Sequence, residues 1–277
     1  MGRLLTEAGF PVVAVASRTP KRAQRGAEFA GPGVQPADFA DLPGLARRIL
    51  ITVADDAIPQ VAGTLAAAGM ESGVVLHTCG ALGPEALSPL ERQGVACGAL
   101  HPLQTIPSPE RGVTALRSIA WGITVTGEAA RWAEEIVAAL DGRPLRVSAE
   151  NRALYHAAGV TACNYVIGLM DAAAALMGST GAGPAEALEA LRPIVESSLR
   201  NSFELGPAAA LTGPISRGDC DTVSRHLEAL RGQPETIREL YRAAGLHTAA
   251  LARRSGLNEA KARQLEQLLR DNRDNHA

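Results

Sequence analysis

The sequence predicts an α/β domain built on a parallel sheet, followed by an all-α domain. In the first half, short apolar segments alternate with helical segments of about 10–15 residues, which is the pattern of βαβ units. The last strand-like segment ends at residue 149, and the chain beyond it has the composition of helices. A length of 277 residues suits two domains. We therefore expect an α/β domain at residues 1–147 and a helical domain at residues 148–277.

The elements of the first half are expected as one helix and then a series of strands and helices. Residues 3–9 have the composition of a helix that ends at Gly9. The predicted strands are short apolar segments at residues 11–17, 49–54, 73–78, 95–99, 119–126 and 144–149. Their carboxyl ends run into short polar or glycine-containing loops, where parallel sheets bind ligands.

The beginning of the sequence differs from that of a dinucleotide-binding domain. Such a domain begins with a strand, a GxGxxG turn and a helix, whereas this sequence begins within the helix. Gly2 is too close to Gly9 to be the last glycine of such a turn. We therefore expect Met1 to be an internal start or the product of a truncated gene. The first strand and the phosphate-binding turn would then be missing, and cofactor binding would be weak.

The loop after residues 11–17 favours NADP over NAD. It holds Ser17 and Arg18, and Lys21 and Arg22 follow one turn into the next helix. An acid at this position accepts the ribose hydroxyl of NAD, whereas an arginine accommodates the 2′-phosphate of NADP. An arginine is always charged, and the start of a helix adds a favourable dipole. The alternative interpretation is a solvated, basic helix start.

Residues 149–177 are predicted to form one long helix that is apolar almost all round and therefore buried between layers. His156 and Asn164 lie on one broad face of it, about 80° apart. Unpaired polar groups are costly to bury. His156 and Asn164 therefore either have hydrogen-bond partners within the core or form a polar patch that faces a cleft between the domains. We expect the patch, with His101 at the end of residues 95–99 facing it.

Three further polar residues are candidate substrate ligands: Gln104, Thr212 and Arg217. Gln104 follows His101 closely, and Thr212 begins a Thr-Gly-Pro turn. Arg217 could hold a substrate carboxylate through two hydrogen bonds. The alternative is that Arg217 and Asp219 pair with each other and cap the next helix.

The composition argues against several classes of protein. A net charge of −2 without a strongly basic stretch argues against nucleic-acid binding. Apolar runs shorter than about 18 residues argue against a membrane span. The four cysteines are widely spaced, which indicates neither a metal site nor a disulfide framework. The N-terminus lacks the features of a signal peptide, so we expect a cytoplasmic protein.

Six motifs resemble a bacterial family of Rossmann-like oxidoreductases whose helical half is domain of unknown function 2520. The motifs are SRTPKRA, TVADDAI, VLHTCGALG, GALHPLQTIP, LYHAAGVTACNY and LTGPISRGD, and the resemblance runs from residue 1 to about residue 255. More distantly, the sequence resembles the pyrroline-5-carboxylate, ketopantoate and 3-hydroxyisobutyrate reductases and dehydrogenases. The resemblance implies a Rossmann domain, a helical domain that forms a homodimer, and NADP as the cofactor. It also implies that the loop of Ala54 and Asp55 lies along the adenine ribose and pyrophosphate, and that Gly80 lets the backbone approach the nicotinamide.

The sequence departs from the hydroxyacid enzymes at one catalytic position. Those enzymes carry a proton-donating lysine one helical turn before an asparagine, and Val160 stands there if Asn164 is that asparagine. His156 could replace the lysine, since a histidine ordinarily titrates near pH 6.5. The expected function is NADPH-dependent reduction of a small ketone, a ketoacid (ketopantoate-like, for instance) or an imine, with His156, Asn164 and His101 as catalytic residues. The alternative is a non-catalytic NADP-binding or sensing protein.

Overall fold

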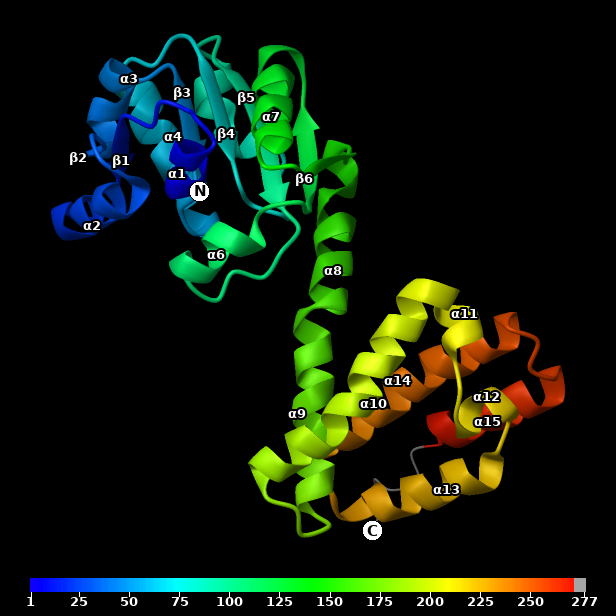
Figure 1. Cartoon of the computed structure of the whole chain (residues 1–277). Coiled ribbons are helices and arrows are strands. Elements are labelled where there is room, and N and C mark those ends of the chain that lie inside the picture. Colours follow the sequence, from blue (N-terminus) through cyan, green and yellow to red (C-terminus); the bar gives the residue numbers. More distant parts are fainter. Residues whose placement is uncertain (272–277) are drawn as a thin grey trace. The chain divides into compact units, whose positions relative to one another are not determined.

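The computed structural model describes residues 1–271, which form two compact units (Figure 1). The first unit ends at Asn164 and the second begins at Tyr165. Each unit is described by itself below.

The first unit contains two sheets. Strands β1 and β2 form a parallel pair, and the other five strands form a sheet in the order β3-β4-β5-β6-β7. The strands are β1 (Ala14–Ala16), β2 (Gln35–Ala37), β3 (Arg48–Ile51), β4 (Val74–His77), β5 (Ala96–Pro102), β6 (Ala120–Val125) and β7 (Arg143–Arg146). The helices are α1 (Gly2–Glu7), α2 (Pro20–Ala30), α3 (Leu42–Leu45), α4 (Ile58–Ala67), α5 (Ser88–Glu91), α6 (Pro109–Ala115), α7 (Gly127–Ala139) and α8 (Arg152–Ala162). The Rossmann-like fold class expected from the sequence is confirmed, although β2 was not expected.

Two strands of the larger sheet run opposite to the other three. Strands β3, β4 and β5 are parallel to one another, as the sequence predicted, whereas β6 pairs antiparallel with β5 and β7 is parallel to β6. The connection between β5 and β6 contains only the two-turn helix α6. The chain therefore returns beside β5 instead of crossing over the sheet to a parallel position.

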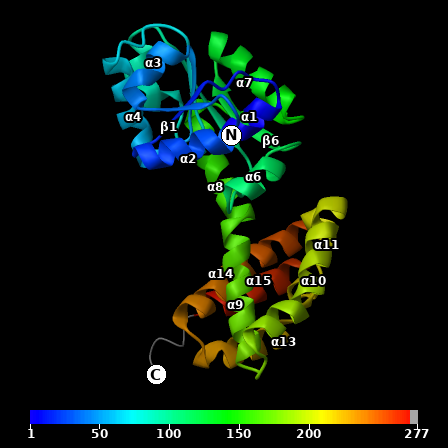
Figure 2. The same cartoon turned by 60° about the vertical axis from the view of Figure 1, so that its left-hand side comes forward.

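Helices cover both faces of the larger sheet. Leu5 of α1 and Ile136 of α7 pack with Leu76 of β4 on one face. Leu65 of α4 packs with Val75 of the same strand on the other face. Figure 2 shows α1 and α7 on one side of the strands and α4 on the other. A strand that is buried on both faces needs a continuous apolar run, and β4 has one.

The two sheets of the first unit are separated by a cavity. Within residues 1–271, β1 pairs only with β2, and β3 pairs only with β4. The cavity between β1 and β3 has a volume of about 660 Å³.

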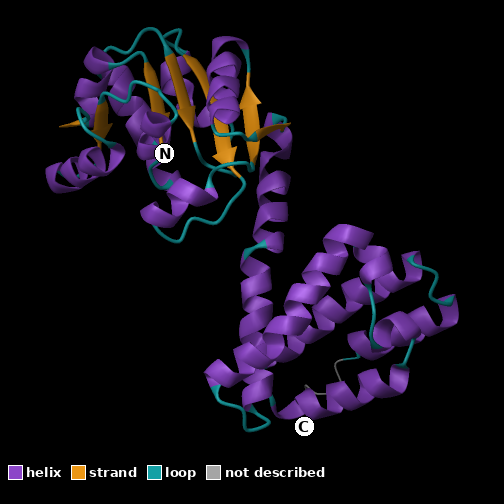
Figure 3. Ribbon diagram, viewed as in Figure 1, coloured by secondary structure: helices purple, strands orange, loops and turns teal. Residues whose placement is uncertain are grey.

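Helix α8 belongs to the first unit by its contacts, although the sequence predicted a domain boundary at residues 147 and 148. The side chain of Arg152 is buried and bonded to β6 and to the loop after β4, which joins α8 to the sheet. The chain leaves the helical path at Cys163 before α9 (Asn164–Gly178) begins. Figure 3 shows this interruption, so the expectation of one unbroken helix was wrong.

The expectation that this helical stretch is buried was also wrong. Arg152 is the one buried residue of α8, and α9 has none. Among the described residues, Ala149–Gly178 is the one helical stretch long and apolar enough to cross a membrane by length and composition alone. A core helix of a soluble protein meets the same criteria, so this finding is weak evidence for a membrane span.

The second unit is helical throughout its described residues. After α9 come α10 (Pro184–Leu205), α11 (Pro207–Ala210), α12 (Pro214–Arg217), α13 (Cys220–Ala229), α14 (Glu235–Arg254) and α15 (Glu259–Arg270). Val223, Ala249 and Leu265, from α13, α14 and α15, pack together with Leu269 as its core. This unit agrees with the all-α half that the sequence predicted.

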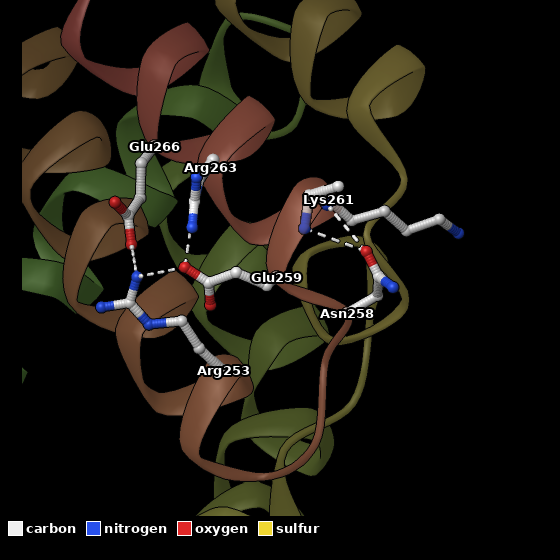
Figure 4. A network of polar contacts seen from close by, with 7 residues as sticks. Arg253, Asn258, Glu259, Lys261, Arg263 and Glu266 are labelled. Atoms are coloured by element: carbon white, nitrogen blue, oxygen red, sulfur yellow. Dashed lines mark hydrogen bonds and ion pairs between the residues drawn. The ribbon is translucent and has the colours of Figure 1, made fainter.

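Polar contacts fix the turn between α14 and α15 (Figure 4). The side chain of Asn258 accepts hydrogen bonds from the backbone N–H groups of Ala260 and Lys261, which caps the start of α15. Arg253 lies 3.6 Å from Glu259 and 3.4 Å from Glu266. Because these charged groups are solvent-accessible, their main effect is to orient the helix ends and not to stabilise them strongly.

Candidate active site

Three ring side chains gather around His101, close to the loop that follows β4. His101 comes from β5, and Tyr155 and His156 are neighbours on α8. The ring centres of His101 and Tyr155 are 5.5 Å apart, and those of His101 and His156 are 5.9 Å apart. The Tyr155 hydroxyl lies 2.8 Å from Nδ1 of His101. The structure therefore brings together His101 and His156, as the sequence predicted, and adds Tyr155.

Two glycines allow the rings to pack this closely. A Cβ atom on Gly80 would lie 2.5 Å from Cδ2 of His156 and 2.8 Å from Nε2 of His101. A Cβ atom on Gly122 of β6 would lie 2.4 Å from the Tyr155 hydroxyl oxygen. In the structure Gly80 makes room for the two imidazoles, and its close approach to a nicotinamide stays a prediction.

A buried arginine holds α8 against the sheet. Arg152 is 1% exposed, and its guanidinium donates to the carbonyls of Leu82, at 3.0 Å, Gly122, at 3.3 Å, and Cys79. Its charge also lies 5.6 Å from the centre of the Tyr155 ring. Burial of the guanidinium lowers the pKa of Arg152. Sequence reasoning missed both Arg152 and Tyr155, although each lies within or beside the LYHAAGVTACNY motif.

The surroundings of His101 favour its neutral form. Burial, with a smaller effect from the positive charge of Arg152, lowers the pKa of His101 to about 4. At neutral pH the imidazole therefore has one N–H donor and one acceptor nitrogen. When the Tyr155 hydroxyl donates to Nδ1, the N–H is on Nε2, the nitrogen beside Gly80. Burial also raises the pKa of Tyr155, so the phenol keeps its proton.

His77 plays a different part from His101. It is fully buried at the end of β4, where Nε2 lies 2.9 Å from the carbonyl oxygen of Gly83 and Nδ1 accepts from the N–H of Cys79. Burial lowers the pKa of His77, in keeping with a neutral ring. Both nitrogens are used within the loop after β4, so His77 shapes that loop.

The start of α2 presents a group of positive charges. Thr19 caps the helix by accepting a hydrogen bond from the backbone N–H of Arg22, and the first turn holds no acid. Arg18, Lys21 and Arg22 are exposed, and Ser17 is partly buried. An anionic phosphate suits this end of an 11-residue helix, where free N–H groups and cations meet.

The pyrophosphate end of a dinucleotide site is less complete. Helix α1 has only six residues, and Met1 serves as its N-cap without a side-chain hydrogen bond. Ala54 and Asp55 lie exposed after β3, where the sequence placed them. Among residues 1–271, no glycine-rich turn leads from a strand into α1. The described residues therefore fit the adenosine phosphate of NADP better than its pyrophosphate.

Within the first unit, Gln104 and Asn164 lie outside the ring cluster. Gln104 is exposed, and its amide is engaged with the backbone of Ala115 and Thr105. Asn164 is exposed at the start of α9.

Two candidates fall in the second unit. Thr212 and Arg217 are exposed there. Asp219 accepts hydrogen bonds from the backbone N–H and the hydroxyl of Thr222 and so caps the start of α13. Arg217 takes no part in these two hydrogen bonds, whereas the alternative interpretation had Arg217 and Asp219 cap the helix as a pair. Within the described part of the chain, no group of three or more His, Cys, Asp or Glu side chains is placed to hold a metal ion.

The fold and the site define a protein with a dinucleotide-fold domain and a helical domain, and the comparisons agree. Residues 1–102 match the model of a Rossmann-like domain, and residues 119–248 match the model of domain of unknown function 2520. The chain therefore combines a Rossmann-like domain with a DUF2520 domain. A search of curated proteins gives no significant match.

Solved structures share this fold along nearly the whole chain. A protein assigned as an NADP oxidoreductase from Bacteroides fragilis is 23% identical, with a TM-score of 0.68 and coverage of 91% of this chain and 92% of that one. A protein from Thermotoga maritima is 19% identical, with a TM-score of 0.63 and coverage of 98% of each chain. An imine reductase from a Pseudomonas species is 16% identical, with a TM-score of 0.56 and coverage of 97% and 87%. At these identities the likeness establishes the fold.

Proposed function

We propose that the protein is an NADPH-dependent oxidoreductase that reduces a small ketone, ketoacid or imine. The observation that carries this proposal is the bonded pair of Tyr155 and His101 beside His156, at the ends of β4 and β5. Several proteins of this fold support it, since they are described as an NADP oxidoreductase, imine reductases and a pyrroline carboxylate reductase with NADP bound. We place the activity in the cytoplasm, as the sequence predicts.

The start of α2 would hold the distinguishing phosphate of the cofactor. Arg18 and Lys21 would pair with the 2′-phosphate, with Ser17 and Arg22 beside them. The loop of Ala54 and Asp55 would contact the ribose and pyrophosphate. NADPH would supply the hydride, and the protein would supply position and a proton.

The ring cluster would deliver that proton. The Nε2–H of His101 would donate to the carbonyl oxygen or imine nitrogen of the substrate as the hydride arrives. The Tyr155 hydroxyl would in turn give its proton to Nδ1, which leaves a phenolate whose charge the nearby Arg152 guanidinium would balance until water returns the proton. His156, whose ring edge meets that of His101, would hold the substrate or donate a second hydrogen bond.

NADPH oxidation with a panel of ketones, oxoacids and cyclic imines tests the proposal. One of these classes should be reduced with NADPH in preference to NADH, and His156→Ala should lower kcat by roughly 10²- to 10⁴-fold without changing the Kd for NADPH. NADPH binding without turnover of any class would instead favour a non-catalytic nucleotide sensor. The observation that favours this second candidate is Val160, which stands where the resembling hydroxyacid enzymes carry a proton-donating lysine.

We also propose that the helical unit forms a homodimer. Helices α9 and α10 expose many large apolar side chains, which a monomer would leave in water. They are Tyr165, Ile167, Leu169, Leu188, Ile194, Leu199, Phe203 and Leu205, all at least 43% exposed. A second copy of the chain is the partner that matches such a face by symmetry.

A further inference from the structure

The carboxyl ends of three parallel strands bring an acidic side chain to the ring cluster. Ile51 of β3, His77 of β4 and Ala99 of β5 are partners in the sheet register, so the carboxyl ends of these strands lie at the same edge. Asp55 follows Ile51 by four residues, and His101 follows Ala99 by two. The acid after β3 and the imidazole of β5 therefore meet at the edge where such sheets bind ligands.

Cys79 lies between Asp55 and the rings. Burial raises the pKa of the Cys79 thiol, and a hydrogen bond with the Asp55 side chain also raises it. The next residue is Gly80, where a Cβ atom would lie 2.5 Å from Cδ2 of His156 and 2.8 Å from Nε2 of His101. Asp55 therefore contacts the neighbour of the residue against which both imidazoles pack.

An exposed negative charge and a buried positive charge act on His101. Burial and, to a smaller degree, the charge of Arg152 lower the pKa of His101, whereas the charge of Asp55 raises it. The Arg152 guanidinium is buried and donates to the carbonyls of the loop after β4 and of β6, and to the Thr124 hydroxyl. Asp55 is exposed. A ligand beside the His101 ring would therefore meet the carboxylate, while the guanidinium is already occupied by protein groups.

This distribution of charge disfavours an anionic substrate and favours a cationic one. A substrate carboxylate beside His101 would be repelled by Asp55 and could not pair with the occupied guanidinium of Arg152. A cation in the same place would be attracted by Asp55 and could donate a hydrogen bond to its carboxylate. A protonated imine is such a cation, and its carbon accepts a hydride more readily than the carbon of the neutral imine.

The surface next to the rings is apolar. Leu103, two residues after His101, is 38% exposed, and its Cδ1 lies 3.2 Å from the place that a Cβ atom on Gly159 would take. Val160 follows His156 by four residues on α8, so the two side chains lie on the same face of the helix. The part of a substrate that adjoins the reacting bond is therefore expected to be apolar.

We propose that the substrate is a cationic imine with an apolar substituent, whose charge the Asp55 carboxylate balances while Leu103 contacts the apolar part. This inference rests on the proposed reductase activity and narrows its substrate class. The imine nitrogen takes a proton from Nε2–H of His101, and its carbon then accepts a hydride from NADPH, which leaves an amine and NADP⁺. The loop of Ala54 and Asp55 would contact the cofactor through its backbone, because a carboxylate and a pyrophosphate repel each other.

Two imines of one ring size test the proposal on the full chain. 2-Methyl-1-pyrroline has an apolar substituent, and 1-pyrroline-2-carboxylate carries a carboxylate in place of the methyl group. NADPH oxidation should give a kcat/KM for the methyl imine that is roughly 10- to 100-fold higher, the effect of one hydrogen bond to a charged group. Equal or faster reduction of the carboxylate would overturn the proposal.

Asp55→Asn removes the charge and keeps the size of the side chain. It should lower kcat/KM for the methyl imine roughly 10- to 100-fold, mainly through KM, and change the reduction of the neutral ketone cyclopentanone little. The Kd for NADPH should stay the same. Asp56→Asn is the matched control, since Asp56 is also exposed and lies in the same turn. Equal losses for the imine and the ketone on Asp55→Asn would show a structural role and overturn the proposal.

A binding measurement separates this inference from the reductase proposal. 2-Methylpyrrolidine, the product amine, is a cation at neutral pH and binds without turnover. In calorimetry, Asp55→Asn should raise its Kd roughly 10- to 100-fold, and Asp56→Asn should not. If neither imine nor the ketone is reduced but the amine binds in this way, the reductase proposal fails and the cation site stands. If the amine does not bind, or binds equally to both variants, the assignment of Asp55 is overturned whatever the protein reduces.

Discussion

The Tyr155 hydroxyl and Nδ1 of His101 are 2.8 Å apart, although the two residues are 54 positions apart in the sequence. This hydrogen bond joins α8 to β5, and the buried guanidinium of Arg152, one turn before Tyr155, fixes the helix from which the phenol projects. His101 therefore has one nitrogen occupied by a fixed partner and the other beside Gly80. In this arrangement His101 can donate a proton from Nε2, and Tyr155 is the second donor, placed at Nδ1.

Tyr155→Phe should lower kcat about 10- to 100-fold and leave the Kd for NADPH unchanged, because it removes the donor behind His101 and not a cofactor contact. Steady-state kinetics with the best substrate of the panel and a nucleotide titration measure the two effects. The chain offers a matched control, since Tyr241 makes the same 2.8 Å hydrogen bond to Nδ1 of His226 in the second unit. Tyr241→Phe should keep full activity, and equal losses in both variants would contradict the assignment.

Gly80→Ala should disrupt the ring cluster through a steric clash and not through backbone strain. Gly80 does not have a positive φ, so an alanine is allowed by the backbone, but its Cβ would lie 2.5 Å from His156. Overpacking of this kind costs about 1–3 kcal/mol and should displace the imidazoles, with a loss of activity. Gly63→Ala in α4 is the control, because a Cβ there meets nothing within 4 Å. It should stabilise the helix by about 0.5–1 kcal/mol, and a similar gain from Gly80→Ala would contradict the packing described here.

The pKa of His101 predicts how stability depends on pH. In the unfolded chain a histidine titrates near pH 6.5, whereas burial holds the pKa of folded His101 at about 4. Between these values the unfolded chain binds a proton that the folded protein does not, so the free energy of unfolding falls as the pH decreases from 6.5 to 4. The loss attributable to His101 is on the order of 3 kcal/mol.

Urea unfolding at pH 7 and pH 4.5 measures this effect. His101→Gln removes the titrating group, so the difference in unfolding free energy between the two pH values should shrink relative to the unmutated protein. His77, whose pKa burial also lowers, keeps part of the dependence in the variant. An unchanged pH dependence would show that His101 is protonated as readily in the folded protein as in the unfolded chain.

The sequence predicted the order of strands and helices well because the apolar segments are short, β-branched and regularly spaced. It placed His101 and His156 together because His101 ends a strand at the edge where parallel sheets bind ligands, and because a polar residue on an otherwise apolar helix was expected to face that edge. Tyr155 and Arg152 were missed because an aromatic ring and an arginine on a helix usually pack or face solvent. Their roles depend on Gly122 and on carbonyls of the loop after β4, which are remote in sequence. The direction of β6 was missed because periodicity does not report how two strands pair.

Arg18→Ala should weaken NADPH binding by roughly 1.5–3 kcal/mol, or about 10- to 100-fold in Kd, and change NADH binding little. The reason is that only NADPH carries the phosphate that the start of α2 would hold. Fluorescence titration of both nucleotides measures the change. Arg25→Ala, on the same helix but farther from its start, is the charge-matched control and should have a small effect. Equal losses for NADPH and NADH on Arg18→Ala would contradict NADP selectivity.

The exposed apolar face of the helical unit predicts a dimer at micromolar protein concentration. Leu199 and Phe203 are four residues apart on α10, so they lie on one face, and Phe203 is 87% exposed. Replacing both by Glu places charges on that face, which would be costly to bury against a second copy but harmless in a monomer. Analytical ultracentrifugation should therefore show a dimer for the unmutated protein and a monomer with unchanged helix content for the double variant. Leu145→Glu, at an exposed leucine of β7 in the first unit, is the control and should remain dimeric. A monomeric unmutated protein, or a double variant that still dimerises, would show that this face has another role.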